Sequence, residues 1–398
     1  MPVNIHRLPI PFVHDDALNE ENDLFLSRLS EALGYELGNA DVTHLQEGEP
    51  LYVFVPSGGT ENEFKKIFSG IAGPVFLITT GQANSLAASM EILSFIKKMG
   101  GRGEILHGSH EALARRINML ERVMKTKSRL AKGRLGAVGM PSDWLIASEA
   151  DYASVKEATG LTLVDISMEE LLEEIDKATY PETPLVRELL DKHYFAKDMT
   201  TSLNIYGALK RLVEKYELDG FTLRCFDLLD KVHGTGCLAL GILNSEGIFA
   251  GCEGDMPALV SMMVLGTLSE KPVFQANPSR FSDDREQVIL AHCSVPFGMI
   301  DSYRLTTHYE SGIGVGIDGE IPRGEITIFK ASATLDRYFV EKAAIVKNLH
   351  EGNLCRTQIE VACPTCYDFF MNRPIGNHQL IVVGDFKETV EEFFKWVP

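Results

Sequence analysis

The sequence predicts an α/β protein with two doubly wound parallel-sheet domains followed by a β-rich C-terminal domain. Three observations carry this prediction. Apolar strands alternate with amphipathic helices up to about residue 132, the alternation resumes at residue 133, and short strands with Gly-rich turns replace it after about residue 280. Apolar strands that lead into helices are typical of parallel sheets covered on both faces. We therefore expect domains at residues 1–132, 133–280 and 281–398, as suits a chain of 398 residues.

The N-terminal domain repeats a strand–turn–helix unit three times. "LYVFVPSGGTENEF" predicts a strand at Leu51–Val55, a Gly-rich turn and a helix. The second unit has a strand at Val75–Thr79 and a helix that Asn84 or Ser85 opens and Gly100 closes. The third unit is "GEILHGSHEALARRINMLERVMK". The basic stretch that follows, "MKTKSRLAKGR", is a candidate boundary, read as a solvated helix end and linker.

The middle domain resumes the alternation at "LGAVGM", with helices at about 182–193 and 199–217. Its last strands are "DGFTLRCFDLL" and "GIFAGCEGD", which "GTGCLALGILNSEG" connects as a crossover helix. The C-terminal domain contains the short strands "EQVILAHCSVPF", "GIGVGIDGE", "GEITIFKAS", "DRYFVEKAAIVKN" and "CRTQIEVAC". It closes with "NHQLIVVGD" and a final helix, "FKETVEEFFKWV".

Composition and charge exclude several classes of partner. The chain is 45% hydrophobic and 24% charged, as is ordinary for a globular protein, and its formal net charge is −18. An acidic chain without clustered Lys and Arg is a poor ligand for nucleic acid or an anionic membrane. No apolar run suits a signal peptide or a membrane span of about 20 residues. We expect a cytoplasmic protein.

The seven cysteines are an odd number in a chain without a signal sequence, which predicts reduced, mostly buried thiols. Cys363 and Cys366 form a lone CxxC pair. A zinc site needs a second pair or histidines at set spacing, and a redox motif needs a thioredoxin-like setting. Plain packing is therefore the favoured interpretation of this pair.

Carboxylates follow two strands of the middle domain. "FTLRCF" runs into Asp227, and "GIFAGC" runs into Glu253 and Asp255. Ligands of open parallel sheets bind outside the carboxyl ends of the strands, so neighbouring strands would place these acids on one rim. Acids that repel one another there favour a divalent cation such as Mg²⁺ or Mn²⁺. The alternative is structural: Glu253 and Asp255 cap the helix from Met256, and Asp227 is a turn residue.

At these residues the sequence resembles the L-fucose isomerase family and, more broadly, its relatives grouped with arabinose isomerase. Three stretches carry the resemblance: "LRCFDLL…GCLALGILNSEGIFAGCEGDMPALVSMMVLGTLSEKPVF", "ILAHCSVP" and "IGNHQLIVVGD". The order of the elements from about residue 134 to 398 also fits. The N-terminal domain matches only in class and is shorter than in the fucose enzymes.

The resemblance implies an aldose–ketose isomerase that holds a divalent metal, commonly Mn²⁺, with Mg²⁺ or Co²⁺ as alternatives. It implies that Asp227, Asp255 and His378 bind the metal and that the two acids take part in catalysis. It places Asn377 against the substrate and makes Glu253 a companion that supports the ligands. The family has a proton-moving glutamate where this chain has the shorter Asp227, and Asp230 is the other candidate for that role.

These residue types suit the chemistry. A ketol isomerase moves a proton between the first two carbons of an open-chain sugar through an enediolate. A metal stabilises the developing negative charge, and a nearby carboxylate carries the proton. The structural alternative for His378 is a satisfied core or surface histidine.

Three further side chains are candidates for the sugar pocket. His292 ends the strand "EQVILAH", where the alternative is a structural hydrogen-bond donor. Trp144 could stack on the sugar, although core packing is the alternative. Arg224 would contact substrate or pair with the acids.

Fold alone does not fix function. One rival is a sugar-binding or regulatory protein without turnover, and another is a different metal-dependent carbon-acid reaction, such as epimerisation or aldol cleavage. The resemblance also implies a homo-oligomer, either a trimer or a hexamer, with a small-molecule sugar as substrate.

Overall fold

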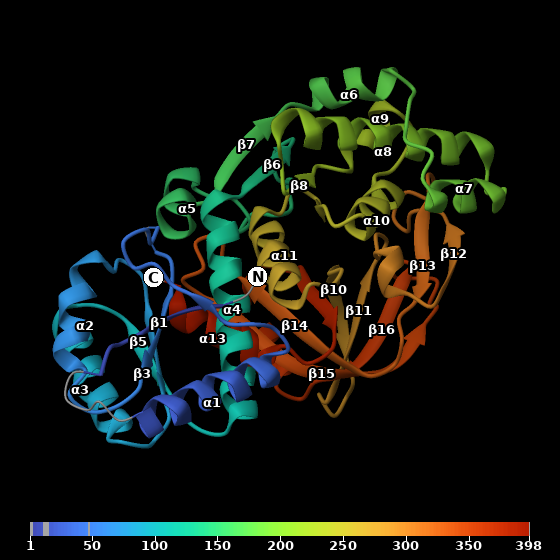
Figure 1. Cartoon of the computed structure of the whole chain (residues 1–398). Coiled ribbons are helices and arrows are strands. Elements are labelled where there is room, and N and C mark those ends of the chain that lie inside the picture. Colours follow the sequence, from blue (N-terminus) through green and yellow to red (C-terminus); the bar gives the residue numbers. More distant parts are fainter. Residues whose placement is uncertain (1–2, 11–15, 47, 398) are drawn as a thin grey trace. The chain divides into compact units, whose positions relative to one another are not determined.

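The computed structural model describes residues 3–10, 16–46 and 48–397. The chain forms two compact units, residues 1–124 and 125–398 (Figure 1).

The N-terminal unit is built on a five-stranded parallel sheet in the order β2-β1-β3-β4-β5. Its strands are β1 (Asn4–Arg7), β2 (Gly38–Asn39), β3 (Leu51–Val55), β4 (Val75–Thr79) and β5 (Gly103–Leu106). Its helices are α1 (Asp16–Leu33), α2 (Glu61–Ile67), α3 (Ser85–Lys98) and the first part of α4 (His110–Lys132), with a short 3-10 helix, η1 (Phe68–Gly70).

Both faces of this sheet are covered, which explains why its central strands are apolar at every position. Alternate residues of β3, such as Val53, pack in one core with Phe64 of α2 and Ile92 of α3. Phe54 points the other way, and its ring centroid lies 5.8 Å from that of Phe25 in α1. The predicted strands 51–55 and 75–79 and the helix start at Ser85 are confirmed.

The basic stretch after this unit is not a linker. Helix α4 continues to Lys132, and β6 begins at Arg134. Only Gly133 separates the two elements, so the structure confirms the helix end and corrects the expectation of a linker.

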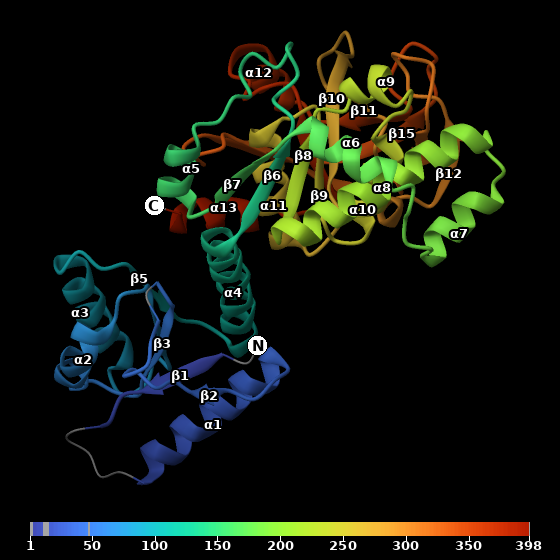
Figure 2. The ribbon, with the colours of Figure 1, turned by 90° about the horizontal axis from the view of Figure 1, so that it is seen from above.

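The second unit begins with a four-stranded parallel sheet in the order β7-β6-β8-β9, whose strands can be followed by their labels in Figure 2. The strands are β6 (Arg134–Val138), β7 (Thr162–Ile166), β8 (Gly220–Leu223) and β9 (Phe249–Cys252). The helices are α5 (Tyr152–Thr159), α6 (Met168–Asp176), α7 (Pro184–Asp191), α8 (Ala196–Tyr216), α9 (Asp227–Lys231), α10 (Cys237–Ser245) and α11 (Met256–Ser269). As expected, β8 and β9 are neighbours with α10 between them in the chain.

The C-terminal part is a closed antiparallel barrel in the order β10-β11-β16-β15-β14-β17, which confirms the β-rich prediction. Its strands are β10 (Phe274–Phe281), β11 (Gln287–His292), β14 (Glu325–Ala331), β15 (Tyr338–Leu349), β16 (Thr357–Ala362) and β17 (Gln379–Val383). A hairpin of β12 (Ser302–Thr306) and β13 (Gly316–Glu320) stands beside it. The remaining helices are η2 (Phe297–Met299), α12 (Cys366–Asn372) and α13 (Lys387–Trp396). The predicted domain start at residue 281 coincides with the end of β10, the first barrel strand.

Helix α11 joins the sheet to the barrel. Every one of its residues is buried, and it packs against β9 on one side and against β14 and β17 on the other. The Ser261 hydroxyl bonds both backbone groups of Ala331, at 2.9 and 3.2 Å. This helix therefore fixes one end of the barrel against the carboxyl edge of the sheet. Within the described ranges, no helix is both long enough and apolar enough to cross a membrane.

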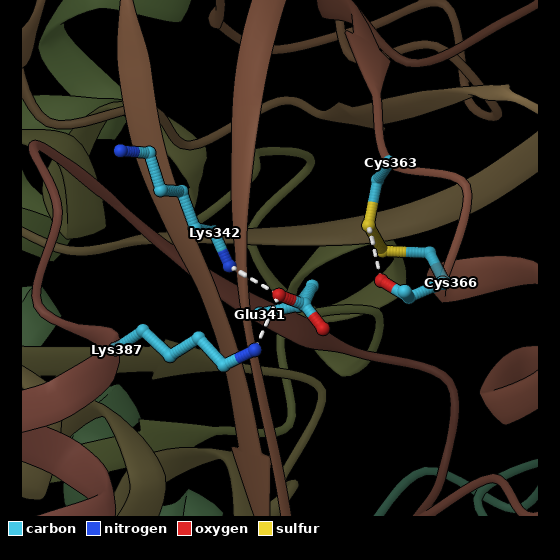
Figure 3. The surroundings of a disulfide bond; sticks show 6 residues. Glu341, Lys342, Cys363, Cys366 and Lys387 are labelled. Atoms are coloured by element: carbon cyan, nitrogen blue, oxygen red, sulfur yellow. Dashed lines mark hydrogen bonds and ion pairs between the residues drawn. A yellow bond between two sulfur atoms is a disulfide. The ribbon is translucent and has the colours of Figure 1, made fainter.

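The CxxC pair is oxidised in the structure. Cys363 and Cys366 form a disulfide at the start of α12, near the ion pair of Glu341 and Lys387 (Figure 3). This corrects the expectation of reduced thiols for the pair. The other five cysteines are free.

Candidate functional site

The carboxyl edge of the parallel sheet meets one end of the barrel. Glu253 directly follows β9, His292 is the last residue of β11, and His378 precedes β17. Gln275 of β10 fixes the two parts together, because its side-chain oxygen accepts a hydrogen bond of 2.9 Å from the Cys252 amide at the end of β9. Elements that are far apart in sequence thus bring three side chains to one place.

These three side chains form a buried cluster of one carboxylate and two imidazoles. Glu253, His292 and His378 are 8%, 5% and 0% exposed, and one ligand atom from each lies within 4.8 Å of the others. Glu253 Oε1 is 3.5 Å from Nε2 of His378 and 4.0 Å from Nε2 of His292. The second ring nitrogen of His292, Nδ1, lies 3.0 Å from the Ser294 hydroxyl. Both imidazoles therefore turn Nε2 toward the same carboxylate.

The backbone at Glu253 is held in an unfavourable conformation. Its φ is +65°, in the left-handed region that non-glycine residues seldom adopt. Gly254 follows at +75°, where an added Cβ would lie 2.6 Å from the Pro141 Cα. The Ser142 amide donates to the Glu253 carbonyl at 2.9 Å, and the Trp144 indole donates to its Oε2 at 2.7 Å. Strain of this kind persists where the surroundings fix it, and it gathers at functional sites.

Asp255 serves the cluster from the far side of His378. Its Oδ2 lies 2.8 Å from His378 Nδ1 and 3.4 Å from Lys330 Nζ, and its Oδ1 accepts from the Ala258 amide at 2.8 Å. The helix-cap interpretation is therefore correct for Asp255, and the residue has a second role. Because Nδ1–H donates to Asp255, Nε2 is the nitrogen that keeps a lone pair for the cluster.

The charges in the cluster shift one another's pKa values. Burial raises the pKa of the Glu253 carboxyl, but the two histidines and the indole donor outweigh it and lower the pKa to about 2. Burial also opposes ionisation of Asp255, yet Lys330 and His378 hold its pKa well below the usual range. Burial lowers the pKa of His378, and its two carboxylate neighbours raise it above the ordinary value.

The cluster contains a buried polar atom without a hydrogen bond. Nε2 of His378 faces Glu253 Oε1 at 3.5 Å but forms no hydrogen bond with any residue in the described part of the chain. A buried polar group left in this way is costly unless a ligand satisfies it. One carboxylate oxygen and two imidazole nitrogens are a donor set that suits a divalent transition metal. Glu253, His292 and His378 could therefore hold such an ion, with Asp255 orienting one ligand.

Asp227 lies elsewhere. Strand β8 ends at Leu223, earlier than predicted, and Asp227 is the first residue of α9. Its Oδ1 accepts from Arg224 Nε at 3.0 Å, and the same guanidinium bonds Asp143 at 3.0 Å and the Pro141 carbonyl. Arg224 thus pairs with acids, one of the two expectations for it.

Of the three predicted metal ligands, the structure brings only His378 into the cluster. Asp255 contacts His378 from behind, Asp227 is bound to Arg224, and Asp230 is exposed on α9. Glu253, expected as a companion, and His292, expected in the pocket wall, supply the other donor atoms.

Trp144 and Asn377 lie at the rim. The Trp144 ring packs edge-on against Phe226, with centroids 4.7 Å apart, while its indole bonds Glu253. Asn377 is exposed beside His378 and donates to the Asn277 side chain at 2.9 Å. Contact of either residue with a sugar stays a prediction.

Lys330 is the residue that sequence reasoning missed. It is fully buried on β14 and shares the strand face of Ile326 and Ile328, since alternate residues point the same way. A lysine at a core-facing position of an apolar strand is the signal that could have revealed a buried ion pair.

No protein-family model matches the chain. The chain is similar to the sulfoquinovose isomerases of Priestia aryabhattai and Priestia megaterium (strain ATCC 12872 / QMB1551), with 25% identity to each over 298 residues. The similar region covers 71% of this chain and 66% of each relative, so the chain spans just under two thirds of the length of the curated relatives that it matches. Both relatives carry the name of a sugar isomerase.

Proposed function

We propose that this protein is a metal-dependent ketol isomerase that interconverts an aldose and a ketose through an enediolate. The observation that carries the proposal is the buried cluster of Glu253, His292 and His378, in which one imidazole nitrogen makes no hydrogen bond to the described residues. The similarity to two sulfoquinovose isomerases supports a sugar substrate. This similarity does not favour L-fucose as the substrate. Sulfoquinovose is therefore the first sugar to test, followed by other sulfonated aldoses and by aldoses without a sulfonate.

The three residues of the cluster would hold the metal, for which Mn²⁺ is our first choice and Mg²⁺ or Co²⁺ the alternatives. A divalent ion bound there supplies positive charge that stabilises negative charge developing on the sugar oxygens. Two nitrogen donors favour Mn²⁺ or Co²⁺ over Mg²⁺, which prefers oxygen ligands.

The chain's own residues prepare this site for the reaction. Asp255 holds His378 in one tautomer and one orientation. Burial of the cluster keeps bulk water away from the reacting carbons, which strengthens electrostatic interactions there. Asn377 and the exposed face of Trp144 at the rim would hydrogen-bond and pack against the sugar.

A sugar-binding protein without turnover is the second candidate. The observation in its favour is the ion pair of Asp227 with Arg224, which occupies the carboxylate predicted to move the proton. Such a protein would retain the metal and bind sugar, but it would exchange no carbon-bound proton. We consider epimerisation or aldol cleavage only if exchange occurs without ketose formation.

We also propose that the protein assembles as a homo-oligomer, a trimer or a hexamer. Exposed apolar side chains in the loop after β6 support this, because Met140 and above all Ile146, at 92% exposure, are unusual on a free surface. Sedimentation equilibrium should find three or six chains, and a monomer at micromolar concentration would contradict it.

Proton exchange tests the function directly. Mn²⁺-loaded protein is incubated in D₂O with sulfoquinovose, glucose and fucose, and NMR follows the proton on the second carbon. We expect exchange and ketose formation with at least one sugar, lost on chelation and in Glu253→Gln and His378→Ala. Asp151→Asn, which removes an exposed carboxylate outside the cluster, is the control. Bound metal without exchange for any sugar would favour the binding protein.

A further inference from the structure

A second carboxylate–imidazole pair lies in the loop that follows β12. Nε2 of His308 is 2.9 Å from Oε2 of Glu310, and Nδ1 of the same ring is 2.9 Å from the Ser311 hydroxyl. His308 is buried, whereas the Glu310 side chain is 44% exposed. The imidazole is thus fixed at both nitrogens, and it holds a carboxylate that solvent and small molecules can reach.

The rest of the structure keeps this loop in place. The Val315 amide donates to the Thr235 hydroxyl at 3.2 Å, and Gly314, at φ +65°, packs so closely on Thr235 that a side chain there would collide with it. At the start of the loop, Arg356 donates a hydrogen bond to the Thr307 carbonyl at 2.7 Å. A functional group needs a rigid support of this kind to act with precision.

An aromatic wall connects the pair to the cluster. The His308 ring packs edge-on against Phe226, with centroids 5.4 Å apart. Phe226 packs in turn against Trp144, whose indole bonds Glu253.

The other carboxylates around the site already have strong hydrogen-bond or ion-pair partners. Glu253 accepts from Trp144 and faces the two imidazoles, Asp255 is fully buried with three donors, and Asp227 is bound to Arg224. Glu310 has one oxygen on His308, while the other makes only a weak contact of 3.6 Å with the Cys355 thiol. Moving a proton between carbons requires a positioned base. Because the guanidinium that holds Asp227 stays charged while the partner of Glu310 is a histidine, Glu310 is the better candidate for that base.

We propose that Glu310 is the catalytic base of the isomerisation and that His308 positions it; this inference rests on the proposed function. The carboxylate takes the proton from the second carbon, and the electrons of the broken C–H bond form a double bond to the first carbon. The first-carbon oxygen takes the negative charge and then receives the hydroxyl proton of the second carbon. Glu310 returns its proton to the first carbon, which yields the ketose.

The charge state of Glu310 suits this role. Burial raises the pKa of its carboxyl, but His308 outweighs burial and lowers the pKa below the ordinary value. The group is therefore ionised and able to accept a proton at neutral pH. The Cys355 and Cys293 thiols are the other titratable groups near it, and Arg356 acts on His308.

The test compares Glu310→Gln with Glu320→Gln in the Mn²⁺-loaded protein. Glu320 is a matched control, since it is 38% exposed and pairs with His350 at 2.7 Å. We expect Glu310→Gln to slow exchange at the second carbon by roughly 10²- to 10⁴-fold while it keeps its metal and its melting temperature. Glu320→Gln should exchange like the wild type. Glu310→Asp keeps the charge and should retain part of the activity even if the glutamine variant folds poorly.

His308→Gln separates positioning from mere structure. Loss of the imidazole that lowers the pKa of Glu310 should move the acid limb of the pH–rate profile to higher pH, which a packing defect would not do. Wild-type exchange rates in both Glu310 variants would overturn the proposal and leave the isomerase intact. Absence of exchange in the wild type with every sugar would instead overturn the proposed function, and this inference with it.

Discussion

Asp255 and His378 meet in the interior of the second unit, where Oδ2 of the aspartate lies 2.8 Å from Nδ1 of the imidazole and neither side chain is exposed. The same carboxylate caps α11. One residue thus ties the start of a buried helix to the ring that faces Glu253. We read this contact as the support that aims His378 Nε2 into the candidate metal site.

Asp255→Asn should therefore weaken metal binding, although the three side chains that bind the metal remain. Loss of a partner that orients a metal-binding histidine typically costs roughly 10- to 100-fold in affinity. Titration with Mn²⁺, followed by electron paramagnetic resonance of the free ion, measures this change. Asp151→Asn is the matched control, because Asp151 caps α5 through the Ser154 amide at 2.6 Å and lies outside the cluster. Equal affinities for the two variants would show that Asp255 acts only as a helix cap.

Lys330→Met should destabilise the fold strongly. Lys330 and Asp255 are both fully buried at 3.4 Å, and removal of one partner of such a pair costs roughly 3–5 kcal/mol because the other charge stays buried. Urea denaturation measures the loss. Lys342→Met, which breaks exposed ion pairs with Glu325 and Asp385, should have little effect. The prediction fails if the two methionine variants are equally stable.

Glu253→Gly should abolish metal binding and cost less stability than Glu253→Gln. Glycine adopts the positive φ of this position without strain, so the backbone gains about 1 kcal/mol while the metal ligand is lost. Glu253→Gln removes the charge but keeps the strain, and it separates the two effects. Denaturation curves and Mn²⁺ titration of both variants check this. A glycine variant markedly less stable than the glutamine variant would mean that the left-handed backbone is not a source of strain.

The pKa of Glu253 predicts a loss of stability in acid. Its pKa is about 2 in the folded protein, against 4.5 ordinarily. A lowered pKa contributes stability that is present above the ordinary value and lost as the pH falls toward the folded value. The free energy of unfolding should thus fall between about pH 4.5 and pH 2, and less steeply in Glu253→Gln. Urea denaturation at a series of pH values tests this, and parallel curves for the two proteins would contradict it.

The sequence predicted those parts of the fold that depend on local pattern. The apolar strand before Glu253 and the buried helix after Asp255 are continuous in the chain, and both formed as expected. The barrel was foreseen only as β-rich, because its closure depends on pairings such as β10 with β17, about 100 residues apart in sequence.

The same distinction explains the site. His378 was found through a resemblance, but its partnership with Glu253 and His292 depends on three separate elements meeting. The strand pattern extended β8 to Phe226, although the chain leaves the sheet after Leu223, so Asp227 begins helix α9 instead of directly following the strand. Local strand propensity does not reveal the residue at which a strand stops pairing with the adjacent strands of the sheet.

Manganese binding by two variants tests the central claim most directly. His292→Asn removes a donor that the geometry assigns to the metal, and Asp227→Asn removes one that the sequence assigns to it. Electron paramagnetic resonance counts the Mn²⁺ bound to each purified variant beside the wild type. The account predicts that the wild type and Asp227→Asn retain tight binding while His292→Asn loses it. Tight binding by His292→Asn, with loss in Asp227→Asn, would contradict the assignment of Glu253, His292 and His378 as the metal site.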